Sequence, residues 1–248
     1  MPLLGGVAVL CGIVAGAAVA GLRFESVHPA ALLAIAMAVL VGLLDDRRKD
    51  AFPLAVKLVG LAAAALLASC ALPQVRVPSW EQLMAFAWCF TVLNAFNLSD
   101  NANGLSPGLA AIPFVAFALG TSPRALAADQ QIVLATVAGA SLGFLPFNYP
   151  RAWLFLGDGG SYGLGMILAV WVSPWQMGWL APALIAVPLV DAAWVTLVRL
   201  RLGIAPWYGD RRHLSHRLMQ AGWNPAAAVA LLWLLGLAIA IVAIAAFP

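Results

Sequence analysis

The residues of this chain that could do chemistry are acidic and histidine side chains, and they are rare. Only 9% of the residues are charged, yet Asp45 and Asp46 stand side by side, Asp158 lies in a glycine-rich turn, and His213 and His216 lie three positions apart. Carboxylates bind hard cations such as Mg²⁺, which bridge and neutralise diphosphate oxygens. The set therefore suits phosphoryl transfer.

Glycines beside these acids suit the same reaction. The turn Gly157–Ser161 precedes an apolar run, so we expect free backbone N–H groups at a helix start to cradle an anion there. Asp45 and Asp46 have a plainer alternative, since an acidic pair without other motifs is more often a solvated helix cap. Asp191 lies inside an apolar run. Two roles are open for it: a functional carboxylate, or a structural hydrogen bond to a neighbouring helix.

The composition predicts a membrane protein that would position these residues. The chain is 64% hydrophobic with a mean hydropathy of +0.96, against about 45–50% hydrophobic for soluble domains. Only helices or closed barrels satisfy the backbone in lipid, and the apolar runs have helical lengths. We therefore expect an all-α, polytopic helical bundle forming one domain over residues 1–248. Its nine or so transmembrane helices would cover residues 3–22, 29–44, 53–72, 82–97, 106–120, 129–147, 160–173, 177–199 and 226–247.

The loops between these runs fall into two alternating sets that differ in charge. One set and its helix ends carry ten of the thirteen Lys and Arg residues, an excess that predicts a cytoplasmic location. The N-terminus would then be inside and the C-terminus outside. Asp45, Asp46, Asp158 and both histidines fall in the same set, so we expect one site at the cytoplasmic membrane surface. The set comprises residues 45–52, 98–105, 148–159 and 200–225.

Two other kinds of site fit the sequence poorly. A transporter would place its ionisable groups near the middle of the bilayer, whereas here they gather at one surface, with Asp191 the exception. Cys11, Cys70 and Cys89 lie inside apolar runs without the spacing of a zinc site or a disulfide framework.

Four ordered motifs give the chain a resemblance to the polyprenyl-phosphate N-acetylhexosamine-1-phosphate transferase family. An Asp-Asp pair ends an early helix in Gly42–Asp46, and an Asn-rich helix end runs into an acidic segment in Asn94–Leu105. Phe-Asn at 147–148 is followed by Phe-Leu-Gly-Asp-Gly-Gly-Ser at 155–161, and a histidine-containing loop covers His213–Leu218. The resemblance extends over positions 5 to about 225.

The resemblance implies an enzyme of the bacterial inner membrane that depends on Mg²⁺, with Mn²⁺ as the alternative metal. Such enzymes move a sugar-1-phosphate, here first of all GlcNAc-1-phosphate, from a UDP-amino sugar to undecaprenyl phosphate and release UMP, which starts a cell-envelope polysaccharide. No nucleic acid partner is implied, and a homodimer is open because relatives are often dimers. A catalytically impaired member acting as a membrane scaffold is the main alternative.

The family roles carry over residue by residue. Asp158 would be the principal metal ligand, and Asp45 and Asp46 would position or deprotonate the lipid phosphate. The other implied site residues are Asp100 beside the diphosphate, Lys49 and Lys57 on phosphate oxygens, Asn97 and Asn103 at the substrate, Asn148 on the nucleotide, Phe155 on the uracil, and His213, His216, Arg212 and Arg217 in a loop that grips the sugar or diphosphate.

Three positions depart from the family pattern. Asn103 stands where the family has a second Asp, which removes a charge but keeps hydrogen-bonding capacity. Ser215 replaces the middle His of the usual His-x-His-His. The segment 1–6 resembles one that follows a first helix in the family, so we expect one family helix to be absent.

Overall fold

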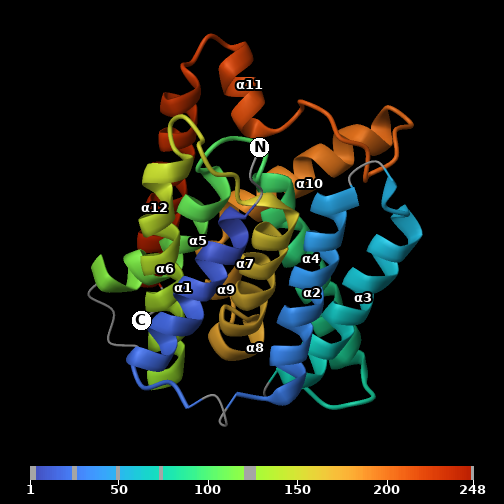
Figure 1. Ribbon diagram of the computed structural model, residues 1–248, viewed down its shortest axis with the longest axis vertical. Coiled ribbons are helices and arrows are strands. Elements are labelled where there is room, and N and C mark those ends of the chain that lie inside the picture. Colours follow the sequence, from blue (N-terminus) through green and yellow to red (C-terminus); the bar gives the residue numbers. More distant parts are fainter. Residues whose placement is uncertain (1–3, 24–26, 49–50, 73–74, 120–126, 247–248) are drawn as a thin grey trace.

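Helices account for all the regular secondary structure that the computed structural model describes, which covers residues 4–23, 27–48, 51–72, 75–119 and 127–246 (Figure 1). The all-α prediction is confirmed for these residues. In chain order the helices are α1 Gly5–Val19, α2 Pro29–Arg48, α3 Leu54–Ala71, α4 Trp80–Ser99, α5 Leu105–Leu119, α6 Ala128–Asn148, α7 Gly157–Trp171, α8 Pro174–Met177, α9 Leu180–Leu184, α10 Ala186–Arg201, α11 Leu214–Gln220 and α12 Pro225–Ala246.

Within the described ranges, four helices are long and apolar enough to cross a membrane. They are α2, α3, α6 and α12, which have 18 to 22 residues each. The helices α1 and α5 are apolar but shorter, with 15 residues each. The protein is therefore a helical membrane protein, while the full number of spans and the orientation of the termini stay predictions.

The predicted continuous helix over residues 177–199 is wrong. The structure divides this stretch into the end of α8, the short α9, and α10, with a break at Ile185, whose φ and ψ are −122° and 32°. Pro188 lies three residues beyond the break. Proline lacks an N–H group and its ring crowds the carbonyl four residues earlier, here that of Leu184, which favours a break at this point. In Figure 1, α10 leaves the lower part of the bundle and rises beside α4.

Helix α7 is the centre of the bundle, and close backbone contacts hold it against α1 and α2. All of its residues are buried except Asp158 and Trp171. A Cβ atom added at Gly42 of α2 would lie 2.5 Å from the backbone of Asp158, and one added at Gly6 of α1 would lie 2.5 Å from the backbone of Gly160. Small residues let membrane helices approach in this way, so the acidic end of α2 meets the start of α7.

Replacing Gly42 by Ala should therefore destabilise the fold. The new methyl group would press on the backbone of α7, and overpacking of this kind typically costs about 1–3 kcal/mol. We expect a lower temperature of thermal unfolding in detergent, followed by tryptophan fluorescence. Gly139→Ala is the matched control, because an added Cβ meets nothing within 4 Å there. Equal unfolding temperatures for the two variants would contradict the close contact.

Candidate active site

The carboxylate of Asp46 caps the N-terminus of α7. Its Oδ1 accepts a hydrogen bond from the backbone N–H of Asp158 at 2.9 Å, and its Oδ2 accepts one from Gly159 at 3.0 Å. Gly157 makes room for the carboxylate, since it has φ +71° and any Cβ there would lie 2.6 Å from Asp46 Oδ2. These are the N–H groups that were expected to cradle a phosphate. That expectation is corrected, because the chain's own carboxylate holds them.

Asp158 is held from two sides. Lys57 of α3 donates from Nζ to its Oδ2 at 2.9 Å and also pairs with Asp45. Asn97 of α4 donates from Nδ2 to Oδ1 of Asp158 at 2.9 Å and contacts Ser161 Oγ at 3.0 Å. The Asp158 carboxylate thus lies where α2, α3, α4 and α7 meet. Asp158 and Lys57 are 101 positions apart in the sequence.

Asp100 is a further acid close to Asp158 and Asp46. Asp100 follows the last residue of α4 and is half-buried. Its pKa lies well above the usual range for Asp, because burial disfavours the charged form and because Asp158 and Asp46 add negative charge nearby. Asp45, Asp46, Asp100 and Asp158 therefore form one patch, the carboxylate patch, into which Lys57 brings a positive charge.

The donor set of the carboxylate patch fits a hard divalent cation. No group of three or more His, Cys, Asp or Glu side chains in the described part of the chain forms a ready-made metal shell. Mg²⁺ does not require one, since it is usually held by one or two carboxylates together with waters and substrate phosphates. Asp158, together with Asp45 or Asp100, would hold the ion, while both oxygens of Asp46 accept hydrogen bonds from the backbone of α7.

A second group of polar residues anchors the loop between α10 and α11. Arg199 is only 1% exposed, and its Nε and Nη2 donate to the two carboxylate oxygens of Asp210 at 3.1 and 3.2 Å. Arg212 donates to the same carboxylate from Nη1 at 2.7 Å. Partial burial would raise the pKa of Asp210, but the hydrogen bonds from Arg199 and Arg212 outweigh it and hold the pKa below the usual range.

His213 follows this loop and contacts Asp191. The His213 Nδ1 lies 2.7 Å from Asp191 Oδ2, and both side chains are buried. The His216 ring is 6.3 Å away between centroids. Burial lowers the pKa of His216, and the positive charge of Arg211 acts in the same direction, which favours a neutral imidazole at pH 7.

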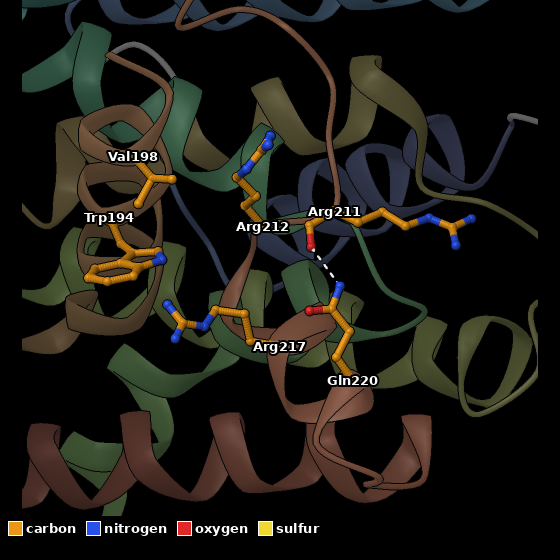
Figure 2. Close-up of a pocket in the computed structure, with 6 residues that line it drawn as sticks. All are labelled: Trp194, Val198, Arg211, Arg212, Arg217 and Gln220. Atoms are coloured by element: carbon orange, nitrogen blue, oxygen red, sulfur yellow. Dashed lines mark hydrogen bonds between the residues drawn. The ribbon is translucent and has the colours of Figure 1, made fainter. Parts of the chain in front are cut away.

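A cationic pocket of about 570 Å³ opens between α10 and α11 (Figure 2). Its volume is within the usual range for small-molecule sites. The Arg217 guanidinium lies 4.7 Å from the centre of the Trp194 ring, and Figure 2 shows it next to this ring. The residues that line this pocket, called here the arginine pocket, are Trp194, Val198, Arg211, Arg212, Arg217 and Gln220.

A hydrogen bond ties α11 to the neighbourhood of the carboxylate patch. The Ser215 hydroxyl donates to Asn101 Oδ1, and Asn101 directly follows Asp100. Ser215 is 1% exposed. At the position where the family has a histidine, the chain therefore uses a smaller hydroxyl to fasten α11 to the turn between α4 and α5.

The predicted substrate residues at the next loop have structural partners. Asn148 is 2% exposed; its Oδ1 accepts from the N–H of Gly104 at 2.6 Å and its Nδ2 donates to the Leu154 carbonyl at 2.7 Å. It therefore joins two loops through both ends of its amide. Asn103 is exposed and donates from Nδ2 to the Pro150 carbonyl at 3.2 Å.

The structure thus brings together most of the predicted site residues in two neighbouring groups, the carboxylate patch and the residues around the arginine pocket.

Two further predicted site residues are assigned to neither group. Phe155 is half-buried, and its backbone carbonyl accepts a hydrogen bond from the N–H of Gly5 at 3.1 Å. Lys49 lies outside the described residues. Asp191 was left open between a functional and a structural role, and Arg199 and Asp210 were not predicted as site residues, although a charge inside an apolar helix, as at Arg199, is itself a signal of function.

A comparison of the sequence with known proteins shows which family the chain matches. The sequence profile described as glycosyl transferase family 4 matches residues 28–174, a range that includes the whole carboxylate patch. The chain is 29% identical to the probable undecaprenyl-phosphate N-acetylglucosaminyl 1-phosphate transferase of Bacillus subtilis, over 98% of this chain and 73% of that protein.

Two further relatives support the same likeness. The undecaprenyl-phosphate alpha-N-acetylglucosaminyl 1-phosphate transferase of Yersinia pestis is 30% identical, over 98% of this chain and 72% of its own length. The phospho-N-acetylmuramoyl-pentapeptide-transferase of Bacillus licheniformis is 34% identical, over 66% of this chain and 58% of its own. The resemblance drawn from the four motifs is confirmed.

Proposed function

The chain belongs to glycosyl transferase family 4, and on that premise we propose that it transfers an N-acetylhexosamine-1-phosphate from a UDP-sugar to undecaprenyl phosphate. GlcNAc-1-phosphate is the first candidate, because the relatives from Bacillus subtilis and Yersinia pestis carry that sugar in their names. An oxygen of the lipid phosphate would attack the sugar-bound phosphorus. The bond from that phosphorus to the oxygen it shares with the UMP phosphate would break, and UMP would leave with the electron pair.

The carboxylate patch is the observation that carries this proposal. When bound by Asp158 with Asp45 or Asp100, Mg²⁺ or Mn²⁺ would neutralise charge on the diphosphate oxygens. Lys57 already lies between Asp45 and Asp158, so its ammonium group can turn to a phosphate oxygen as the substrates enter. Asp45 would orient the lipid phosphate or accept its proton. Asp46, as the cap of α7, would keep Asp158 in place.

The arginine pocket supports the same reaction. Arg212 and Arg217 offer the positive charge that a sugar diphosphate needs, and the Asp210 carboxylate fixes the direction of the Arg212 guanidinium. Both groups of residues lie in, or at helix ends next to, the loops with excess basic charge, so we propose that the site faces the cytoplasm from the bacterial inner membrane.

The direct test is an assay with purified protein, UDP-GlcNAc, undecaprenyl phosphate and Mg²⁺. We expect UMP release that depends on all three additions. Asp158→Ala serves as the inactive control. Absence of UMP above that control with several UDP-amino sugars would exclude the enzyme and leave the scaffold alternative. Activity that appears only after Asn103→Asp would assign the loss to that departure from the family.

A further inference from the structure

We propose that Asp191 is a positioning residue that fixes His213 in one tautomer and one orientation at the site. The inference rests on the proposed transferase function, because it assigns His213 a task in that reaction. Asp191 touches no predicted substrate group itself. It would act through the imidazole ring, whose Nε2 atom would be the one to meet a ligand.

The geometry leaves one tautomer compatible with this contact. An ionised carboxylate only accepts hydrogen bonds, so the nitrogen 2.7 Å from Asp191 Oδ2, His213 Nδ1, must carry the proton. In a neutral ring the Nε2 atom then has its lone pair free. The two residues are 4% exposed, and the contact is thus shielded from water. A carboxylate in this position makes the imidazole a fixed acceptor or base at Nε2.

The second carboxylate oxygen orients the ring further. Asp191 Oδ1 accepts from the backbone N–H of Leu214 at 2.7 Å, the residue that begins α11. His213 itself provides no side-chain cap for this helix. Asp191 therefore holds the ring and the adjacent backbone at once, which removes freedom of rotation of His213 relative to α10.

The loop has other anchors, so Asp191 is not needed merely to dock it. Arg199 lies eight residues after Asp191 on α10, about 12 Å along the helix at ~1.5 Å per residue. Its side chain holds Asp210. On the far side, Ser215 is bonded to Asn101. Since the chain is secured on both sides of His213, we expect the loss of the Asp191 carboxylate to change the ring more than the loop.

Asp191→Asn is the informative variant, because the amide keeps the volume and the acceptor for Leu214 but presents an NH₂ group to His213. Nδ1 must then become the acceptor and the proton must move to Nε2. The chain has only three histidines, so ¹⁵N-histidine labelling gives a simple spectrum, with His213→Gln assigning the signal. We expect wild-type protein to be protonated at Nδ1 and the variant at Nε2.

We expect the same variant to lower kcat for UMP release by about 10²–10⁴-fold, because the His213 ring would present an N–H group instead of a lone pair at Nε2. KM for the UDP-sugar should change less than about threefold, and Asp191→Glu should recover part of kcat. The Asp191→Asn/His213→Gln double variant should be no slower than His213→Gln alone, since Asp191 acts through His213.

Two outcomes would overturn the inference: an unchanged Nδ1 tautomer in Asp191→Asn, or additive losses in the double variant, which indicate a purely structural role. If wild-type protein releases no UMP, the proposed function fails. The spectrum and the unfolding temperature of the variants still decide whether Asp191 sets the tautomer of His213.

Discussion

Asp158→Asn should lower the rate of UMP release by at least about 10³-fold, equivalent to about 4 kcal/mol of transition-state stabilisation. Asparagine has the same shape and can still bond Asn97, but it has lost the charge that would hold a divalent cation against the diphosphate. The measurement is kcat across a titration of Mg²⁺. Higher Mg²⁺ should not restore the variant to the wild-type rate.

The control for this prediction removes a negative charge elsewhere. Glu81 lies in the first turn of α4, at the opposite end of that helix from Asn97, and accepts a hydrogen bond from the N–H of Arg76. Glu81→Gln should keep kcat within about twofold of wild type. Were Asp158→Asn to behave like Glu81→Gln, the placement of the metal at Asp158 would be wrong.

Arg199→Met should destabilise the protein by about 3–5 kcal/mol, the usual result of removing one partner of a buried ion pair. The side chains of Arg199 and Asp210 are 1% and 9% exposed, so the carboxylate would lose its deepest partner without gaining water. We expect the unfolding temperature in detergent to fall by about 10 °C. Arg201→Met, at an exposed position of the same helix, should change it by less than about 2 °C.

The pH dependence of this ion pair follows from the lowered pKa of Asp210. A carboxyl group whose pKa is lower in the folded state stabilises the fold at pH values above its unfolded pKa, about 3.9. That stabilisation is lost only as the pH falls toward the folded value. The difference in unfolding temperature between wild type and Arg199→Met should therefore be constant from pH 5 to pH 8. A difference that shrinks within this range would contradict the assignment.

Much of the site could be predicted because its residues lie in short motifs. The Asp45-Asp46 pair, the Asp158 turn and the histidine loop are each local patterns, and the charge asymmetry of the loops predicted that they share one face. What the motifs did not contain was the direction of each side chain. Asp45 and Asp46 are neighbours in sequence, yet Asp45 pairs with Lys57 while Asp46 caps α7.

The break between α9 and α10 is a similar case. Hydropathy over residues 177–199 is continuous, so an apolar pattern alone predicts one helix. Pro188 was visible in the sequence, but proline can also be tolerated in membrane helices when neighbours satisfy the freed backbone groups. Whether it kinks or breaks the chain depends on packing around it.

The sequence by itself determined the class of the protein, an all-α membrane protein of glycosyl transferase family 4, and the residue types of its site. Composition and local spacing suffice for this, because hydrophobic burial and short motifs depend on neighbours along the chain. Only the tertiary structure decided that Asp46 occupies the N–H groups expected to hold phosphate and that Asp191 meets His213. Those pairings join residues 112 and 22 positions apart. The first pairing depends on the close packing of glycine-lined helices, and the second depends on the direction that α10 takes after the break. No local sequence pattern specifies either of these.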